Sequence, residues 1–418
     1  MESPLVTVLC ITYNQVNYVI DMVESIVAQN TSFDYEVIIH DDASSDGTYE
    51  VLKGYEEKYP ELISVIGEEE NQWSKGVKIT QSILMPLVRG KYVAFCEGDD
   101  FWIDHNKLQE QVDFLENNPE YVCVAHNALC VSGGKMYPLN NCEKSREIKD
   151  VEIINRLFPF LATASKVYRK EAFMLDGFFL ECGEVGDMCT EYSAILKGKF
   201  YYIDKIMSIY RYGSMGSWSN RVRKIKYNIE FRAKFLRFLT LYDDYTEHKY
   251  KYYLDQFKSR GVSFICNQLL VQNISYTEFE EIVNDVREKY NGAFDEWLEV
   301  IIPIVKLRVY EADGNFARQI EAVRKDKKIY IYGAGDYAKT LSNQLLNNGI
   351  DYSGYIVFSK MDNPPKMFGK SVFELEEFVD DKDKCLVLVA VDVQKWPEID
   401  VSLKQHGFNN VYCPFYVS

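Results

Sequence analysis

The sequence of 418 residues has no excess of basic residues. It contains 63 Asp and Glu against 47 Lys and Arg, which gives a formal net charge of -16 at pH 7. Because attraction to phosphates dominates nucleic-acid binding, this charge argues against a general nucleic-acid-binding protein. It is compatible with one phosphorylated small molecule, provided that a cation bridges the phosphates to carboxylates.

Long apolar runs and paired cysteine motifs are also missing. No stretch approaches the roughly 20 apolar residues that cross a bilayer, so we expect any membrane association to be peripheral. The N-terminal residues MESPLVTVLCITYN contain no basic segment ahead of an apolar one, so we expect no signal peptide. The ten cysteines are scattered without a C-x-x-C motif. This favours a reduced, cytoplasmic protein over a disulfide framework.

The length exceeds that of a usual single core, so we expect two or three domains. The first two hundred residues alternate strand-like and helix-like segments, as in α/β domains with a largely parallel sheet. Long helical patterns then replace this alternation, and a strand, a glycine turn and a helix follow near residue 327. We therefore predict an α/β domain over residues 1–219, a helical region over 220–325 and a small α/β module over 326–418.

Three polar turns each follow an apolar strand pattern in the first domain. They are TYN at 12–14, DDASSDG at 41–47 and EGDD at 97–100. Ligands bind open α/β sheets at the carboxyl ends of the strands, so we expect the turns to converge on one cleft.

The third of these turns places Glu97, Asp99 and Asp100 within four positions. Like charges at this range disfavour ionisation unless a cation neutralises them. Mg²⁺ or Mn²⁺ prefers such oxygen ligands and commonly bridges carboxylates to substrate phosphates. A solvated acidic turn is the alternative interpretation.

The motifs of the first domain resemble those of glycosyltransferase family 2, an inverting family with the GT-A fold. The resemblance covers roughly residues 4–218 and rests on TVLCITYNQVNYVIDMVESIVAQN, EVIIHDDASSDGT, KYVAFCEGDDFWIDHNKLQEQVDFLENNPEY and YYIDKIMSIYR. It implies a metal-dependent enzyme that transfers a sugar from a UDP- or dTDP-sugar to a glycan or lipid-linked acceptor. Polysaccharide or glycoconjugate biosynthesis is the expected setting.

The resemblance also implies roles for single residues around the donor. Tyr13 would pack on the nucleotide base, and Asp42 would accept a hydrogen bond from it. Asp99 would contact the ribose. Asp100 would coordinate the metal bound to the diphosphate, with Glu97 as a second candidate ligand.

Two further residues have structural alternatives to their implied roles. Trp102 would form a wall of the donor or acceptor site, whereas a core aromatic is the alternative. Arg211 would stabilise the leaving diphosphate, whereas a structural salt bridge is the alternative.

An inverting transfer needs a general base that takes the proton of the acceptor hydroxyl. Family members place an acidic residue at a helix start beyond the acidic turn, and Asp187 fits that position best. Glu184 and Glu191 are the alternatives, and a carboxylate that stabilises a helix N-terminus is the structural alternative for Asp187. Relatives often have a histidine where this chain has Gly213, so its metal site lacks one ligand of that pattern.

Residues 221–238 reverse the charge of the chain locally, with seven basic residues against one acidic residue. We favour a helix packed on the first domain, and contact with an anionic membrane surface is the alternative.

The C-terminal module contains GAGDYA at 333–338, which matches the dinucleotide-binding pattern G-x-G-x-x-A. The following strand pattern ends at 356–359 without the acidic residue that holds a ribose, which disfavours NAD binding. The module resembles Rossmann-like domains attached to sugar-processing enzymes, and a role in homo-oligomerisation or regulation is at least as well supported. A nicotinamide-linked sugar-modifying enzyme and a non-catalytic sugar-nucleotide-binding relative are the alternatives for the whole chain.

Overall fold

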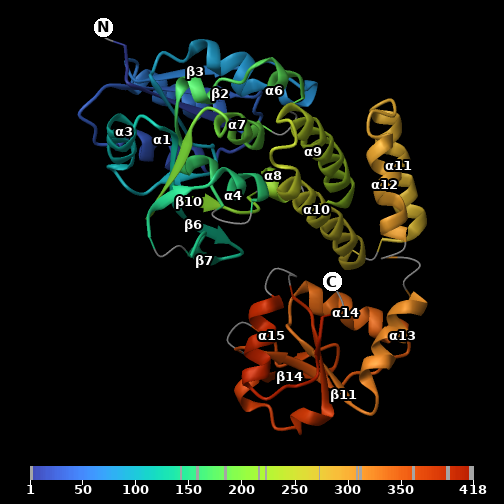
Figure 1. Ribbon diagram of the computed structural model, residues 1–418. Coiled ribbons are helices and arrows are strands. Elements are labelled where there is room, and N and C mark those ends of the chain that lie inside the picture. The colour runs from blue at the N-terminus through green and yellow to red at the C-terminus, as the bar shows by residue number, and fades with distance from the viewer. Residues whose placement is uncertain are drawn as a thin grey trace. The chain divides into compact units, whose positions relative to one another are not determined.

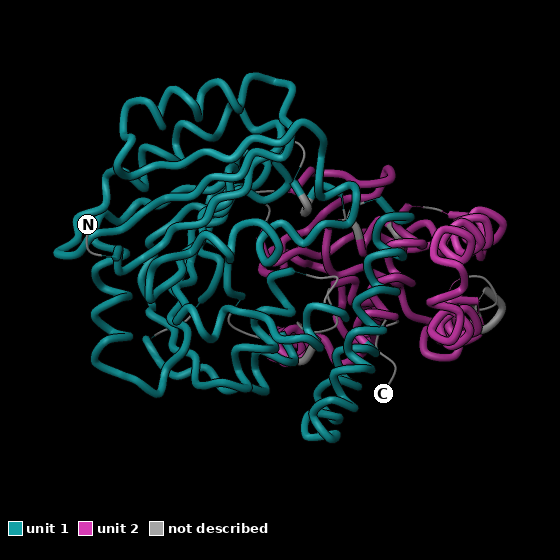
Figure 2. The backbone as a smooth tube through the Cα atoms, turned by 90° about the horizontal axis from the view of Figure 1, so that it is seen from above, with its two compact units in different colours: residues 1–259 teal, residues 260–418 magenta. Residues whose placement is uncertain are grey.

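The computed structural model describes residues 3–141, 144–156, 160–182, 186–214, 217–221, 224–272, 274–306, 309, 313–359, 363–391 and 396–413. The chain divides into two compact units, residues 1–259 and 260–418 (Figure 2). The division falls within helix α10 (Lys251–Val271), inside the region predicted to be helical.

A mixed sheet forms the centre of the first unit (Figure 1). Its strand order is β3-β2-β1-β4-β9-β6-β10-β5, with β7 beside β6 and β8 beside β10. The parallel strands at one side are β1 (Val6–Thr12), β2 (Tyr35–Asp41), β3 (Ile63–Gly67) and β4 (Tyr92–Phe95). The others are β5 (Phe101–Trp102), β6 (Tyr121–Ser132), β7 (Lys135–Pro138), β8 (Arg146–Ile148), β9 (Val167–Arg169) and β10 (Lys199–Arg211).

Helices accompany these strands along the first unit. They are α1 (Val19–Val27), α2 (Thr48–Lys58), α3 (Lys107–Asn117), α4 (Asp150–Asn155), α5 (Lys170–Phe173), α6 (Gly177–Cys182), α7 (Gly186–Ala194), α8 (Trp218–Arg221) and α9 (Ile225–Tyr245). In α1 the helical period buries Val19, Met22, Val23 and Ile26.

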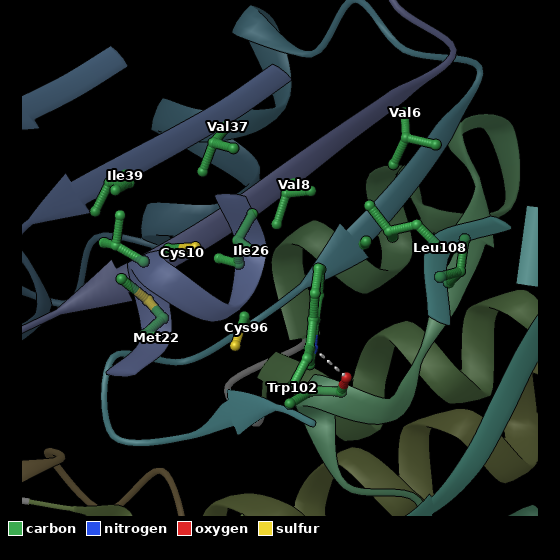
Figure 3. Packing of buried hydrophobic residues seen from close by; sticks show 14 of the residues in the cluster. Val6, Val8, Cys10, Met22, Ile26, Val37, Ile39, Cys96, Trp102 and Leu108 are labelled. Carbon is green, nitrogen blue, oxygen red and sulfur yellow. Dashed lines mark hydrogen bonds between the residues drawn. The ribbon is translucent and has the colours of Figure 1, made fainter. Parts of the chain in front are cut away.

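The core of the first unit is built from these helices and the inner strands (Figure 3). Val8 of β1 and Ile39 of β2 are fully buried, and Met22 of α1 belongs to the same cluster. Burial along β1 is nearly continuous, as expected for a parallel strand with both faces covered. Each aliphatic side chain buried in this way stabilises the fold by about 1.5–3 kcal/mol.

Parallel pairing brings the polar turns to one edge of this sheet. Thr12 at the end of β1 pairs with Asp41 at the end of β2. Just beyond β4, the Gly98 amide donates to the Ile11 carbonyl at 3.2 Å. The predicted convergence of the three turns is therefore confirmed.

The basic stretch at 221–238 contributes to α9, whose apolar residues are buried in the first unit. They include Ile225, Ile229, Ala233, Leu236 and Leu239. Its hydrophobic face is thus covered by protein, which supports the packed-helix interpretation over contact with a membrane. No helix in the described part of the chain is long and apolar enough to span a bilayer.

The described part of the second unit begins with helices, which a module with a mainly parallel sheet follows. The helices are α11 (Tyr276–Lys289), α12 (Asp295–Val305) and α13 (Asp313–Arg324). The sheet order is β13-β14-β12-β11-β15-β16, in which only β13 is antiparallel to its neighbour. The strands of this sheet and the helices between them are β11 (Lys328–Tyr332), α14 (Asp336–Asn347), β12 (Gly354–Val357), β13 (Lys366–Met367), β14 (Lys370–Glu374), β15 (Cys385–Val389), α15 (Trp396–Gln405) and β16 (Val411–Tyr412).

The glycine turn after β11 has a clear steric reason. Gly333 has a φ of +111°, and a Cβ there would lie 2.8 Å from the Ala390 carbonyl oxygen. A side chain at this position would be strained and would clash with the loop after β15. The first glycine of the pattern is therefore explained by packing, without a nucleotide.

Candidate active site

The first two polar turns are tied together by hydrogen bonds centred on Asp41. Its Oδ1 accepts from the hydroxyls of Thr12 at 2.9 Å and Ser44 at 2.6 Å, and its Oδ2 accepts from the Ser44 amide at 2.9 Å. The Ser44 hydroxyl in turn accepts from the Asn14 amide at 2.8 Å. Asp41 is thus a structural anchor that fixes the turn bearing Tyr13, whose side chain is 43% exposed.

Asp42 lies beside this anchor and faces a different segment of the chain. One carboxylate oxygen accepts from the Gln72 amide at 2.6 Å and the other from the Trp73 amide at 3.1 Å. A carboxylate has about four acceptor positions, so two amide donors leave capacity for a further donor. The site around Asp42 therefore includes the segment 71–73, which sequence reasoning missed because no motif marks it.

The acidic turn packs closely against the first turn. A Cβ on Gly98 would lie 2.7 Å from Thr12 Cγ2 and closer still to the side-chain oxygen of Gln15. A larger residue would force the side chains of Thr12 and Gln15 to move, so glycine lets the two turns approach this closely.

Asp100 is the most deeply buried carboxylate of the acidic turn, with 1% exposure. Its Oδ1 accepts from the Arg211 amide at 2.8 Å, whereas its Oδ2 is buried and has no hydrogen-bond partner. Burial, followed by the charges of Asp99 and Glu97, raises the pKa of Asp100 well above its ordinary value. An ionised Asp100 at neutral pH therefore needs a cation.

Glu97 shares this crowded environment. Burial, followed by the carboxylates of Asp99 and Asp187, raises the pKa of Glu97 to about 8. Asp99 lies beside it, and its Oδ2 accepts a hydrogen bond from the Ser214 hydroxyl. The three carboxylates thus lie close together, as predicted. All three are negative when ionised, so none of them can neutralise another.

The carboxylates of the acidic turn fit a divalent cation whose coordination is completed by the phosphates of a substrate. Among the described residues, no group of three or more His, Cys, Asp and Glu side chains is arranged to hold a metal ion. Mg²⁺ and Mn²⁺ are commonly bound through one or two carboxylates together with substrate phosphates. The buried free oxygen of Asp100 is suited to that mode of binding.

The candidate bases lie at and near the N-terminus of α7. Asp187 is in the first turn of this helix, is exposed, and accepts from the Met188 amide at 2.8 Å. Glu191 is buried and paired with Lys166 at 2.7 Å and Arg156 at 3.0 Å. Its carboxylate is therefore committed to two cations, and Glu184 lies outside the described residues.

The comparison with protein families decides the assignment. Residues 7–175 match the model of glycosyl transferase family 2. The N-terminal region belongs to glycosyltransferase family 2. The resemblance found in the sequence motifs is thereby confirmed.

Curated relatives of this family-2 region match part of the chain. The uncharacterized protein Rv1520 of Mycobacterium tuberculosis is 30% identical over 214 residues, 51% of this chain and 60% of that protein. The putative teichuronic acid biosynthesis glycosyltransferase TuaG of Bacillus subtilis is 38% identical over 113 residues, 27% of this chain and 42% of that protein. A third relative, from Escherichia coli, is the UDP-Glc:alpha-D-GlcNAc-diphosphoundecaprenol beta-1,3-glucosyltransferase WfaP. It is 29% identical over 112 residues, 27% of this chain and 41% of that protein. The chain thus spans about 60% or less of the length of these relatives.

A solved structure supports the predicted GT-A fold. Residues 1–349 of TarS from Staphylococcus aureus, in complex with UDP-GlcNAc, give a TM-score of 0.51 at 18% identity. The match covers 83% of this chain and 93% of that chain.

Gly213 is the position at which the resemblance in the sequence motifs led us to expect a histidine. Its φ is 79°, a left-handed conformation that glycine adopts without strain. The next residue, Ser214, donates its hydroxyl to Asp99. The segment beyond β10 therefore still reaches the acidic turn, through a serine that the family motif did not indicate.

The guanidinium of Arg211 is held by contacts with neighbouring protein groups in the candidate site. It donates to the Asp99 carbonyl at 2.8 Å and forms a salt bridge with Asp21. It also lies over the rings of Tyr18 at 5.1 Å and Phe101 at 4.6 Å. These contacts match the structural alternative and fasten the acidic turn to α1.

Trp102 corrects an expectation, because it lies in the core and not on a wall of the site. It is 2% exposed, and its Nε1 donates to the Ala164 carbonyl at 3.0 Å (Figure 3). The Lys107 ammonium lies 4.1 Å from the ring centroid. Its indole is surrounded by protein, so no face is available to a sugar.

Proposed function

We propose that this protein is a metal-dependent, inverting glycosyltransferase. It transfers a sugar from a UDP- or dTDP-sugar to a glycan or lipid-linked acceptor. The observation that carries the proposal is the buried, unpartnered Oδ2 of Asp100, which lies in an acidic turn at the same sheet edge as Asp42 and Tyr13. A family-2 assignment of residues 7–175 supports it.

The donor is held along the edge of the sheet, in this proposal. The exposed ring of Tyr13 packs on the nucleotide base, and Asp42 accepts a hydrogen bond from it. Asp99 contacts the ribose, and Asp100 holds Mn²⁺ or Mg²⁺, with Glu97 as a second candidate ligand. The metal, when bound, neutralises part of the charge of the diphosphate.

Asp187 is the general base of the proposed transfer. Its carboxylate is exposed at the start of α7 and contributes to the raised pKa of Glu97, which is consistent with a position facing the acidic turn. The acceptor hydroxyl attacks the anomeric carbon from the face opposite the diphosphate, and its proton passes to Asp187. The bond between the anomeric carbon and the diphosphate oxygen breaks, so the anomeric configuration inverts.

A role in polysaccharide or glycoconjugate biosynthesis follows from the names of the relatives. TuaG is named for teichuronic acid biosynthesis, and WfaP for a UDP-Glc donor and a diphosphoundecaprenol-linked acceptor. Both match only part of the chain, so we propose the class of sugar donor and of acceptor and do not take them from these relatives.

The proposal is tested by measuring donor hydrolysis and binding across a panel of sugar nucleotides, with Mn²⁺, with Mg²⁺ and after EDTA. We expect one UDP- or dTDP-sugar to bind and hydrolyse slowly in a metal-dependent way. Binding without hydrolysis or transfer to any acceptor would instead indicate a non-catalytic sugar-nucleotide-binding protein. Absence of binding by every nucleotide sugar would contradict the proposal.

A further inference from the structure

We propose that Arg221 binds the diphosphate of the donor and stabilises it as it leaves, and that Trp73 positions Arg221 for this role. The inference rests on the proposed function, because it assigns a positively charged side chain to the diphosphate of the proposed donor, in addition to the metal.

The side chain of Arg221 contacts the segment that holds Asp42, and its backbone belongs to the segment that reaches Asp99. Toward the base, its guanidinium carbon lies 4.4 Å from the centroid of the Trp73 ring, and the Trp73 amide donates to Asp42 at 3.1 Å. Toward the metal, its amide donates to the Ser217 carbonyl at 3.2 Å, and the Ser217 amide donates to the Ser214 carbonyl at 3.1 Å. Ser214 in turn donates to Asp99. A diphosphate joins the nucleoside to the sugar, so we place it between these two segments, which Arg221 joins.

The guanidinium of Arg221 has the chemistry for this role. It lies against the rings of Trp73 and Tyr227, the latter at 5.9 Å. Stacking uses the face of a guanidinium and leaves the N–H groups at its edge for oxygen acceptors. Its Nε is buried without a hydrogen-bond partner, and among the described residues Arg221 forms no salt bridge.

Three other cations near these turns, all among the described residues, already have partners. Arg211 is paired with Asp21 and the Asp99 carbonyl. Lys75 is paired with Glu70, and Lys78 donates to the Leu180 carbonyl.

The remaining charge at the site is negative. Glu97, Asp99 and Asp100 are crowded in the acidic turn, so a diphosphate that approaches it meets repulsion that one divalent cation offsets only in part. A planar guanidinium that can contact two phosphate oxygens at once supplies the missing positive charge.

The test compares UDP with uridine, which lacks the diphosphate, by calorimetry of the full chain with Mn²⁺. Arg221→Ala is expected to weaken UDP binding roughly ten- to a hundredfold, as for loss of charge-assisted hydrogen bonds, and to leave uridine binding unchanged. Arg237→Ala removes the same charge from an exposed position on α9 and is expected to bind UDP as the wild type does. Thermal melting of each variant shows whether it is folded.

Trp73 is tested as a positioning residue. Trp73→Leu is expected to raise KM for the donor with a smaller effect on kcat, and Trp73→Phe is expected to restore much of the loss because an aromatic face is retained. The ring is 49% exposed, so these changes do not open the core.

Three outcomes would overturn the inference. Unchanged UDP affinity in Arg221→Ala excludes contact with the diphosphate. An equal loss of UDP and uridine binding shows that Arg221 only supports the base pocket. A wild-type protein that binds neither UDP nor dTDP removes the proposed function itself, and this result differs from the first two because it appears before any substitution.

Discussion

The acidic residues of the candidate site differ in their hydrogen-bond and ion-pair partners. Asp42 accepts from two backbone amides, whereas Asp100 keeps one buried oxygen without a partner. Glu191 is paired with two cations, whereas Asp187 is exposed at a helix start. The sequence shows only that acidic residues are present, because partners this distant along the chain leave no local pattern.

The proposed base gives a prediction that separates binding from chemistry. Asp187→Asn is expected to bind donor normally and to lose transfer by roughly 10²- to 10⁴-fold, the usual contribution of a general base. Donor affinity by calorimetry and transfer by product formation are the two measurements. Retained transfer would move the role to Glu184, since Glu191 is committed to Lys166 and Arg156.

Lys107 gives a prediction about pH and stability. Burial lowers the pKa of this lysine to about 7, and its ammonium is buried without a hydrogen-bond partner. In the unfolded chain its pKa is about 10.4, so between about pH 7 and 10 the unfolded state binds more protons. The free energy of unfolding therefore rises with pH over this range, and the destabilisation by Lys107 is complete only below about pH 7.

Lys107→Met is thus expected to stabilise the protein at pH 7 by about 1–3 kcal/mol, as for removal of an unsatisfied buried group. The advantage over the wild type should shrink as the pH rises toward 10. Denaturant unfolding of both proteins at several pH values measures it. A variant that is less stable at pH 7, by an amount independent of pH, would contradict this account.

Among helices and strands, the sequence predicts where the turns of the site meet better than it predicts which distant residues contact them. The turns at 12–14, 41–47 and 97–100 follow strands with clear apolar patterns, so their meeting at one sheet edge could be predicted. Trp73 and Ser214 could not be predicted, because their contacts with Asp42 and Asp99 join distant segments.

The ion pairs of Glu191 are expected to hold helix α7, which bears Asp187, in place. Glu191→Ala leaves the buried Lys166 and Arg156 without their shared carboxylate, which is expected to destabilise the first unit by about 3–5 kcal/mol. Glu181→Ala, at an exposed position of α6, is the control and should change stability little. Equal melting temperatures for the two variants would show that the buried ion pairs do not hold α7.

For the whole molecule, the division into two compact units has a direct consequence. The proposed donor residues all lie within residues 1–259, and the second unit has cores of its own. A chain that ends at residue 272, just beyond α10, is therefore expected to fold and to bind the donor as the full chain does. Calorimetric titration and thermal melting check this, and a loss of donor binding in a folded shorter chain would assign the second unit a part in the site.

In the proposed function, Asp100 holds the metal that binds the donor. Calorimetry of the best-binding sugar nucleotide, with Mn²⁺ and after EDTA, tests it most directly in the wild type and in Asp100→Asn, a substitution of similar size. We expect EDTA to abolish tight binding to the wild type and Asp100→Asn to bind weakly with or without Mn²⁺. Tight binding after EDTA, or wild-type affinity and Mn²⁺ dependence in Asp100→Asn, would contradict it.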